Sequence, residues 1–133
     1  MPKTKRTTAE ILKRIEGLRS LKDGWVDGEG RAVSSYVCDL ARTVITDAKW
    51  FRPYMYPTFD GGLNLEWDVE LDDCTEYHEL QLNPDKSVRY WYFMDTLESD
   101  QDPNDELDLD MTWQNPKPSD IIHALEIYNC IHR

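Results

Sequence analysis

The sequence predicts a single α+β domain, in which two N-terminal helices pack on a four- to five-stranded antiparallel meander and a C-terminal helix follows. Three observations predict this fold. Apolar residues recur every three or four positions up to residue 51, alternate with polar residues from 54 to 113, and return to helical spacing after two prolines. The chain of 133 residues is long enough for one core of modest size. We therefore expect one domain over residues 1–133, with residues 1–7 flexible.

The two N-terminal helices are predicted from their caps and apolar stripes. A threonine cap and an acidic first turn begin a helix over residues 8–21. Its stripe comprises Ile11, Leu12, Ile15, Leu18 and Leu21. A glycine-rich loop over residues 23–30 follows, and we expect it to fold Trp25 back as a core plug. Ser34 or Ser35 then caps a second helix, which we expect to extend through Trp50 and Phe51 until Pro53 ends it.

Alternating apolar and polar residues predict the strands. The clearest strand covers residues 63–71, where Leu63, Leu65, Trp67, Val69 and Leu71 occupy one face. The turn sequence Asp60-Gly61-Gly62 before it predicts a hairpin with a strand over residues 54–59. Turns at 72–73 and 83–86 separate two further strands, over 76–82 and 88–94. These four strands should form an antiparallel meander with the helices on its apolar face.

The chain after residue 94 changes in composition. Residues 95–106 form a polar, acidic segment that we expect to be an exposed loop. Alternation from Leu107 to Trp113 predicts a fifth strand at the sheet edge, where negative charge would discourage aggregation. Pro116 and Pro118 separate that strand from a final helix that begins near Ser119.

Negative charge is concentrated in the second half of the chain. The formal net charge is −11, but residues 1–22 contribute +5 and residues 53–115 contribute −15. So large a charge on half of a small domain causes self-repulsion and repels nucleic acid. A basic partner would relieve the repulsion.

Two segments resemble a known group of small uncharacterised bacterial and phage proteins. The first is Asp23-Gly24-Trp25 through Gly30 with a serine-capped helix after it, and the second is Pro57 to Trp67 with its Asp-Gly-Gly turn and Leu-Glu-Trp. The likeness covers about residues 10–95 and departs from the group's loop at Val26, which is inserted between Trp25 and Asp27. The resemblance implies the helix-helix-meander order and a setting in phages or mobile elements. It implies no activity.

The acidic half predicts a non-enzymatic inhibitor that binds and occludes a basic, nucleic-acid-binding surface, as an anti-defence (anti-CRISPR-like) phage protein would. Carboxylates spaced along strands and a loop can imitate the phosphates of a duplex, which carries about one charge per 1.7 Å of axis. Aromatic neighbours such as Trp91 and Tyr92 would add anchoring area. The predicted partner-binding residues are Glu66, Asp68, Glu70, Trp91, Asp95, Glu98, Asp100, Asp102, Asp105, Glu106, Asp108 and Asp110.

Several alternatives stay open at this stage. One alternative is an antitoxin or immunity protein that neutralises a basic toxin, and another is a solvated acidic face that only keeps the protein soluble. Asp100, Asp102 and Asn104 match the first ligand positions of an EF-hand, but Asp105 and Met111 stand where glycine and glutamate are required. Direct binding of nucleic acid by the basic first helix is opposed by the nearby negative charge.

Zinc and nuclease chemistry are weaker alternatives. Cys74 and His78, with His123, Cys130 and His132, do not match the usual zinc spacings, so core cysteines and surface histidines are the simpler expectation. Asp60 and Glu79-Leu80-Gln81 resemble a metal-dependent nuclease hairpin, except that Gln81 replaces the lysine. We expect no enzyme activity and no cofactor.

The composition also predicts a compartment and an assembly state. Three widely spaced cysteines, Cys38, Cys74 and Cys130, are typical of a reducing environment rather than a disulfide framework. No apolar run approaches the roughly 20 residues that span a bilayer. We expect a cytoplasmic protein, in a bacterium or an infected cell, that is a monomer or homodimer and binds a basic protein or nucleoprotein but neither nucleic acid directly nor a membrane.

Overall fold

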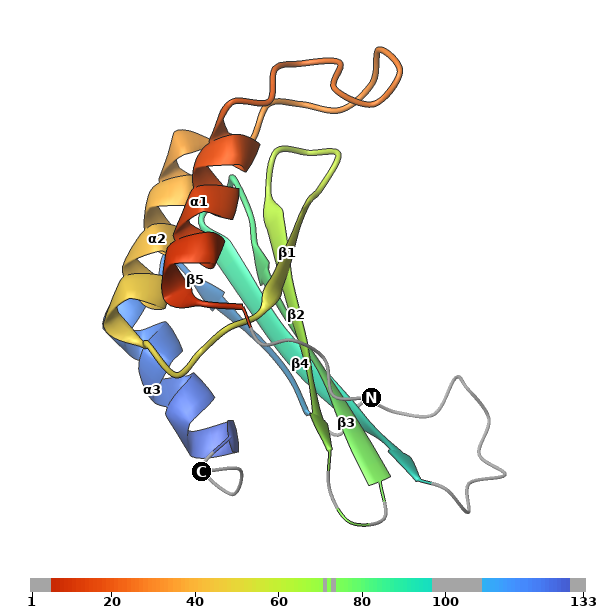
Figure 1. The fold of residues 1–133 in the computed structure, drawn as a ribbon, viewed down its shortest axis with the longest axis vertical. Helices are drawn as coiled ribbons and strands as arrows, with labels where there is room; N and C mark the ends of the chain where they lie inside the picture. The colour runs from red at the N-terminus through yellow and green to blue at the C-terminus, as the bar shows by residue number, and fades with distance from the viewer. Residues whose placement is uncertain (1–5, 71, 73, 97–108, 130–133) are drawn as a thin grey trace.

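Over the residues that the structure describes, the fold has two layers, a five-stranded antiparallel sheet and three helices that lie on one of its faces (Figure 1). A computed structural model describes residues 6–70, 72, 74–96 and 109–129. The strands follow one another in sequence order across the sheet. The elements are α1 (Thr8–Arg19), α2 (Ser35–Asp47), β1 (Tyr54–Pro57), β2 (Leu63–Glu70), β3 (Cys74–Leu82), β4 (Ser87–Thr96), β5 (Leu109–Gln114) and α3 (Pro118–Asn129). The predicted α+β meander is confirmed, including its fifth strand.

Helix α1 begins with a capping box. The Glu10 amide donates to the Thr7 hydroxyl at 3.1 Å, and the Thr7 amide donates to the Glu10 carboxylate at 3.2 Å. These two bonds satisfy amides that a helix start leaves unpaired. The helix buries Ile11, Ile15 and Leu18 and ends at Arg19, close to the predicted end.

Helix α2 is shorter than predicted. Its backbone leaves the helical conformation at Ala48, where φ is −110° and ψ is 76°. Trp50 and Phe51 therefore belong to the connection to β1, and extending the helix through them was wrong. Phe51 is still buried and packs edge-on against Trp67, with 4.8 Å between ring centroids, whereas Trp50 is 43% exposed.

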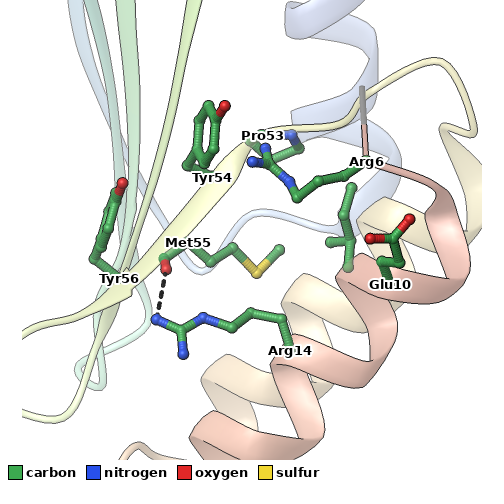
Figure 2. A pocket seen from close by; sticks show the side chains of 8 residues that line it. Arg6, Glu10, Arg14, Pro53, Tyr54, Met55 and Tyr56 are labelled. Atoms are coloured by element: carbon green, nitrogen blue, oxygen red, sulfur yellow. Dashed lines mark hydrogen bonds between the residues drawn. The ribbon is translucent and has the colours of Figure 1, made fainter. Parts of the chain in front are cut away.

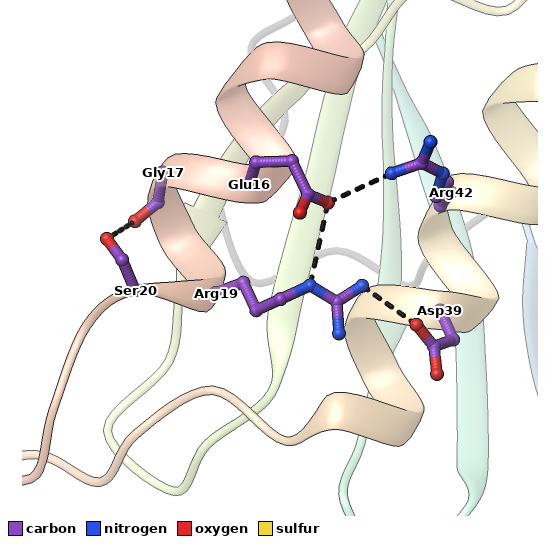
Figure 3. Close-up of polar contacts among 6 residues, drawn as sticks. All are labelled: Glu16, Gly17, Arg19, Ser20, Asp39 and Arg42. Atoms are coloured by element: carbon purple, nitrogen blue, oxygen red, sulfur yellow. Dashed lines mark hydrogen bonds and ion pairs between the residues drawn. The ribbon is translucent and has the colours of Figure 1, made fainter.

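Ion pairs join the exposed sides of α1 and α2 (Figure 3). Arg19 lies 2.8 Å from the Asp39 carboxylate of α2 and 3.5 Å from Glu16 of its own helix. Arg42 of α2 pairs with the same Glu16 at 3.2 Å. Exposed pairs of this kind contribute at most about 1 kcal/mol each. Part of the positive charge of α1 is thus paired with the neighbouring helix rather than with the acidic sheet.

The core lies between the helices and the inner face of the sheet. One row across the sheet shows the register, since Met55, Leu65, Leu80, Tyr90 and Met111 are successive cross-strand partners. The first four of these side chains are buried and the fifth packs against them. Because side chains alternate along a strand, the residues on either side of this row point to the opposite face.

The glycine-rich loop is fastened to the β1–β2 hairpin. Trp25 stacks on Phe59 with 5.9 Å between centroids, and its indole N–H donates to the Arg31 carbonyl at 2.7 Å. The loop passes under the indole at Gly30, where φ is +91° and a Cβ would lie 2.9 Å from the ring. Trp25 is half-buried and lies outside the core, so the predicted core plug was wrong. Its ring covers its own loop instead.

A buried polar network lies on the inner face. The two ring nitrogens of His78 are hydrogen-bonded to the Tyr90 hydroxyl at 2.7 Å and to the Glu76 carboxylate at 3.0 Å. The side chain of His78 is fully buried. The expectation of a surface histidine was therefore wrong for His78, although His123 on α3 is exposed.

Candidate interaction surface on the open face of the sheet

The outer face of the sheet is the face opposite the helices, and no helix of the described chain covers it (Figure 1). We call it the open face. The strand register places on it Tyr54 and Tyr56 of β1, Asn64, Glu66, Asp68 and Glu70 of β2, Thr75, Tyr77, Glu79 and Gln81 of β3, Ser87, Arg89, Trp91 and Phe93 of β4, and Asp110, Thr112 and Gln114 of β5. Five of these residues are acidic and one is basic.

The carboxylates of β2 form a line along the open face. Glu66, Asp68 and Glu70 occupy alternate positions, so about 6.6 Å separates each from the next along the strand. Asp68 and Glu70 are exposed, and Glu66 is half-buried. Within the described chain Glu66 and Glu70 make no ion pair. Glu66 and Glu70 therefore carry negative charge that a basic partner could pair.

Glu79 of β3 adds a fourth carboxylate next to this line. It is the direct cross-strand partner of Glu66. Partial burial raises the pKa of Glu79 above its ordinary value of 4.5, and the neighbouring Glu66 charge raises it further. A hydrogen bond of 3.0 Å from the Gln81 amide to the Glu79 carboxylate acts in the opposite direction. Ionised Glu79 is thus an incompletely compensated charge, which a cation would stabilise.

On the β5 side of the open face, the carboxylate is paired with an arginine. The Arg89 guanidinium donates two hydrogen bonds of 2.9 Å to the two oxygens of the Asp110 carboxylate. This pair lowers the pKa of Asp110 and neutralises its charge. Among the described residues, the open-face carboxylates without an ion pair are therefore Glu66 and Glu70 of β2 and Glu79 of β3.

Aromatic rings lie beside the carboxylates. Phe93 stacks between Tyr77 and Trp91, with centroid separations of 5.1 and 6.1 Å. Tyr54 and Tyr56 stand on the same face at the β1 edge, 38% and 46% exposed. Large rings of this kind dominate the binding energy of protein interfaces.

Two polar atoms of the open face are buried without a hydrogen-bond partner in the described chain. They are Asn64 Oδ1 and Trp91 Nε1. The Trp91 indole lies close enough to Glu79 to lower that carboxyl's pKa, but no acceptor lies in hydrogen-bonding geometry. Both atoms are already covered by neighbouring side chains.

The predicted partner-binding residues fall into three groups. Glu66, Asp68, Glu70, Trp91 and Asp110 all lie on the open face. The backbone of Asp95 pairs with Thr75 at the end of β4. The remaining six, Glu98, Asp100, Asp102, Asp105, Glu106 and Asp108, lie outside the described residues, as does the EF-hand-like segment.

Sequence reasoning missed some residues of this surface and misplaced one. Glu79, Tyr77 and Phe93 were not identified as binding residues, although their alternation along β3 and β4 carries the signal. Tyr92, expected beside Trp91, points to the inner face, where its ring stacks on His78 at 4.7 Å between centroids.

The described residues contain no group of three or more metal-ligating side chains. Asp60 lies in the β1–β2 turn, where it accepts a hydrogen bond from the Thr58 hydroxyl, while Glu79 lies in mid-sheet opposite Glu66. Cys74 and His78 share the inner face, but His78 is bonded to Glu76 and Tyr90. Cys130 and His132 lie outside the described chain.

The chain was compared with known protein families, curated proteins and solved structures. No protein-family model, no curated protein and no solved structure matches the chain. The resemblance to small phage and bacterial proteins therefore stays a prediction. None of the helices in the described ranges has the length and apolar character needed to cross a bilayer.

Proposed function

We propose that this protein is a non-enzymatic inhibitor that binds a basic, nucleic-acid-binding protein surface through the open face and so occludes it. The observation that carries the proposal is that Glu66, Glu70 and Glu79, which make no ion pair within the described residues, share one uncovered face of the sheet with exposed aromatic rings. The carboxylates steer and orient a basic partner, and the rings supply the buried contact area. The proposed setting is a phage protein directed against a host defence complex of the CRISPR type.

The spacing of the charges defines what kind of contact the open face makes. Glu66, Asp68 and Glu70 present one charge per roughly 6.6 Å of strand. A DNA duplex presents one per about 1.7 Å of axis. The three carboxylates of β2 are thus about four times sparser than a duplex. We therefore propose pairing with individual lysine and arginine side chains here, with the acidic residues 98–108 supplying the denser part of the contact.

The proposal is tested by matched charge reversals. Glu66→Lys with Glu70→Lys reverses two carboxylates of the open face. Asp47→Lys with Glu126→Lys makes the same change in net charge at exposed positions on α2 and α3. Each variant is used as bait in a lysate of the host, and the captured protein is then assayed for nucleic-acid binding or cleavage with and without the inhibitor.

We expect the wild type and the helix variant to protect the nucleic acid, and the open-face variant to lose protection and capture together. Protection should also weaken as salt rises, because the Debye length falls from about 10 Å at 0.1 M to 3 Å at 1 M. Equal protection by both variants would refute the role of β2. A second variant, Asp100, Asp102, Asp105 and Glu106 all changed to Lys, tests the acidic segment. Capture of a small basic toxin in fixed stoichiometry would instead identify an antitoxin.

A further inference from the structure

A pocket lies between the N-terminal half of α1 and the edge strand β1 (Figure 2). Its volume is about 270 Å³, and it is lined by Arg6, Glu10, Ile11, Arg14, Pro53, Tyr54, Met55 and Tyr56. This volume is slightly below the range of about 300–1,000 Å³ for pockets that hold drug-sized ligands. The pocket therefore suits a small molecule or a single functional group.

Two arginines of the pocket are held by neutral groups. Arg14 donates to the Met55 carbonyl at 3.2 Å, and Arg6 donates to the Arg52 carbonyl at 3.0 Å. Arg6 also lies over the Tyr54 ring, 3.4 Å from its centroid. These contacts direct both guanidinium groups toward β1 without pairing either with a carboxylate, and Arg14 is exposed while Arg6 is half-buried.

The absence of a carboxylate partner distinguishes these two arginines. Neither Arg6 nor Arg14 makes an ion pair in the described chain, whereas Arg19, Arg42 and Arg89 each do. Glu10 also lines the pocket, but its carboxylate is bonded to the amide and hydroxyl of Thr7. Figure 2 shows this carboxylate on the helix side of the pocket, while both guanidinium groups reach to β1.

The occupant of the pocket is not an added β-strand. In β1 the Met55 carbonyl points away from β2, toward Arg14, and the Met55 amide points the same way. The neighbouring outward positions, Pro53 and Pro57, have no N–H to donate. A strand added at this edge could accept a hydrogen bond from one backbone N–H of β1, that of Met55. One such bond is too few to pair two strands. A compact anion can use the side-chain donors instead.

We propose that this pocket binds the phosphate group of a small phosphate monoester through Arg6 and Arg14. A phosphate monoester carries a charge of about −1.5 to −2 at pH 7, which matches the two positive charges of the arginines. A ligand with a single carboxylate would neutralise only one of them. The planar donors of arginine fit phosphate oxygens. Both arginines belong to the basic N-terminal segment, where residues 1–22 carry +5. The pocket shares Tyr54 and Tyr56 with the open face, but its arginines belong to α1 and the residue before its cap, and the phosphate site does not depend on the proposed function.

The test is a titration of the full chain, labelled with ¹⁵N, with inorganic phosphate and with phenyl phosphate at constant ionic strength. We expect saturable shifts confined to the Arg6 and Arg14 Nε–H signals and to amides of α1 and β1. Arg14→Gln should weaken binding at least about tenfold, because it removes one charge-assisted hydrogen bond. Arg6→Gln should act in the same direction, and Arg14→Lys should give an intermediate loss.

The matched control is Arg42→Gln, which removes an exposed arginine of α2 outside the pocket and should leave phosphate affinity unchanged. Amide dispersion and the melting temperature of each variant show whether it is folded. If Arg14→Gln does not fold, Arg6→Gln is used to test the phosphate site instead. Shifts that grow linearly with phosphate, or that change equally in the Arg42 variant, would overturn the proposal. Benzoate binding as tightly as phenyl phosphate would overturn the assignment to phosphate.

Discussion

Replacing Gly62 by alanine should destabilise the β1–β2 hairpin, which carries Tyr54, Tyr56 and Glu66 of the open face. A Cβ at Gly62 would lie 2.5 Å from the Leu82 carbonyl oxygen and 3.0 Å from the Thr58 hydroxyl. The carbonyl belongs to the buried strand β3 and cannot turn aside as a long side chain can. Gly62 must therefore move, which disturbs its hydrogen bonds to Thr58 of 2.8 and 3.0 Å.

The magnitude follows from these contacts. Overpacking costs about 1–3 kcal/mol, each weakened hydrogen bond about 1 kcal/mol, and alanine returns about 0.4–1 kcal/mol through the unfolded state. The free energy of unfolding should thus fall by about 3 kcal/mol. Unfolding entropy near 2.1 cal/mol/K per residue over 133 residues converts this into a drop in melting temperature of about 11 °C.

The control is the same substitution at Gly17 of α1, where a Cβ would meet nothing within 4 Å. Gly17→Ala should stabilise the protein by about 1 kcal/mol, since alanine is the better helix former. Both melting temperatures are measured by circular dichroism at a fixed protein concentration. If Gly62→Ala melts within about 2 °C of the wild type while Gly17→Ala behaves as expected, the close approach of β3 to the turn does not exist as described.

Two further predictions concern the sheet. Glu79→Gln should raise the melting temperature at pH 7 but not at pH 3. The pKa of Glu79 is raised in the folded state, so folding favours the protonated carboxyl, and stability is lost as pH rises through the folded-state pKa. A gain of equal size at both pH values would contradict this. His78→Leu should cost about 3 kcal/mol in a chemical denaturation experiment, since it removes a buried partner from the Glu76 carboxylate and the Tyr90 hydroxyl. Tyr90→Phe, which removes one of these bonds, should cost about 1 kcal/mol, and equal losses in the two variants would refute the network.

The fold could be predicted because its signals are local. Period-two alternation in residues 63–70 fixes which side chains face the core, and the Asp-Gly-Gly turn fixes where the hairpin closes. The end of α2 could not be predicted in this way. Phe51 has the apolar character of a helix stripe, but it is buried by packing against Trp67, a residue of a distant strand. Tertiary contacts of this kind leave no periodic signal.

The open face could be predicted only in part, for a related reason. Alternation alone identifies Glu66, Asp68 and Glu70 as one row. The neighbours of that row depend on the register between strands, which brings Glu79 next to Glu66 and Tyr77 next to Phe93. The arginine pocket was also missed, because Arg6, Arg14 and Tyr54 lie far apart in the sequence and only the packing of α1 on β1 brings them together.

The position of the aromatic rings separates a binding surface from a merely soluble one. Carboxylates needed for solubility can lie anywhere on a surface, and exposed rings work against solubility. Here Tyr54, Tyr56 and Phe93, each at least 36% exposed, share one face with Glu66, Glu70 and Glu79, which make no ion pair within the described residues. A partner would cover exposed apolar area and charge together, whereas solubility requires the charge alone.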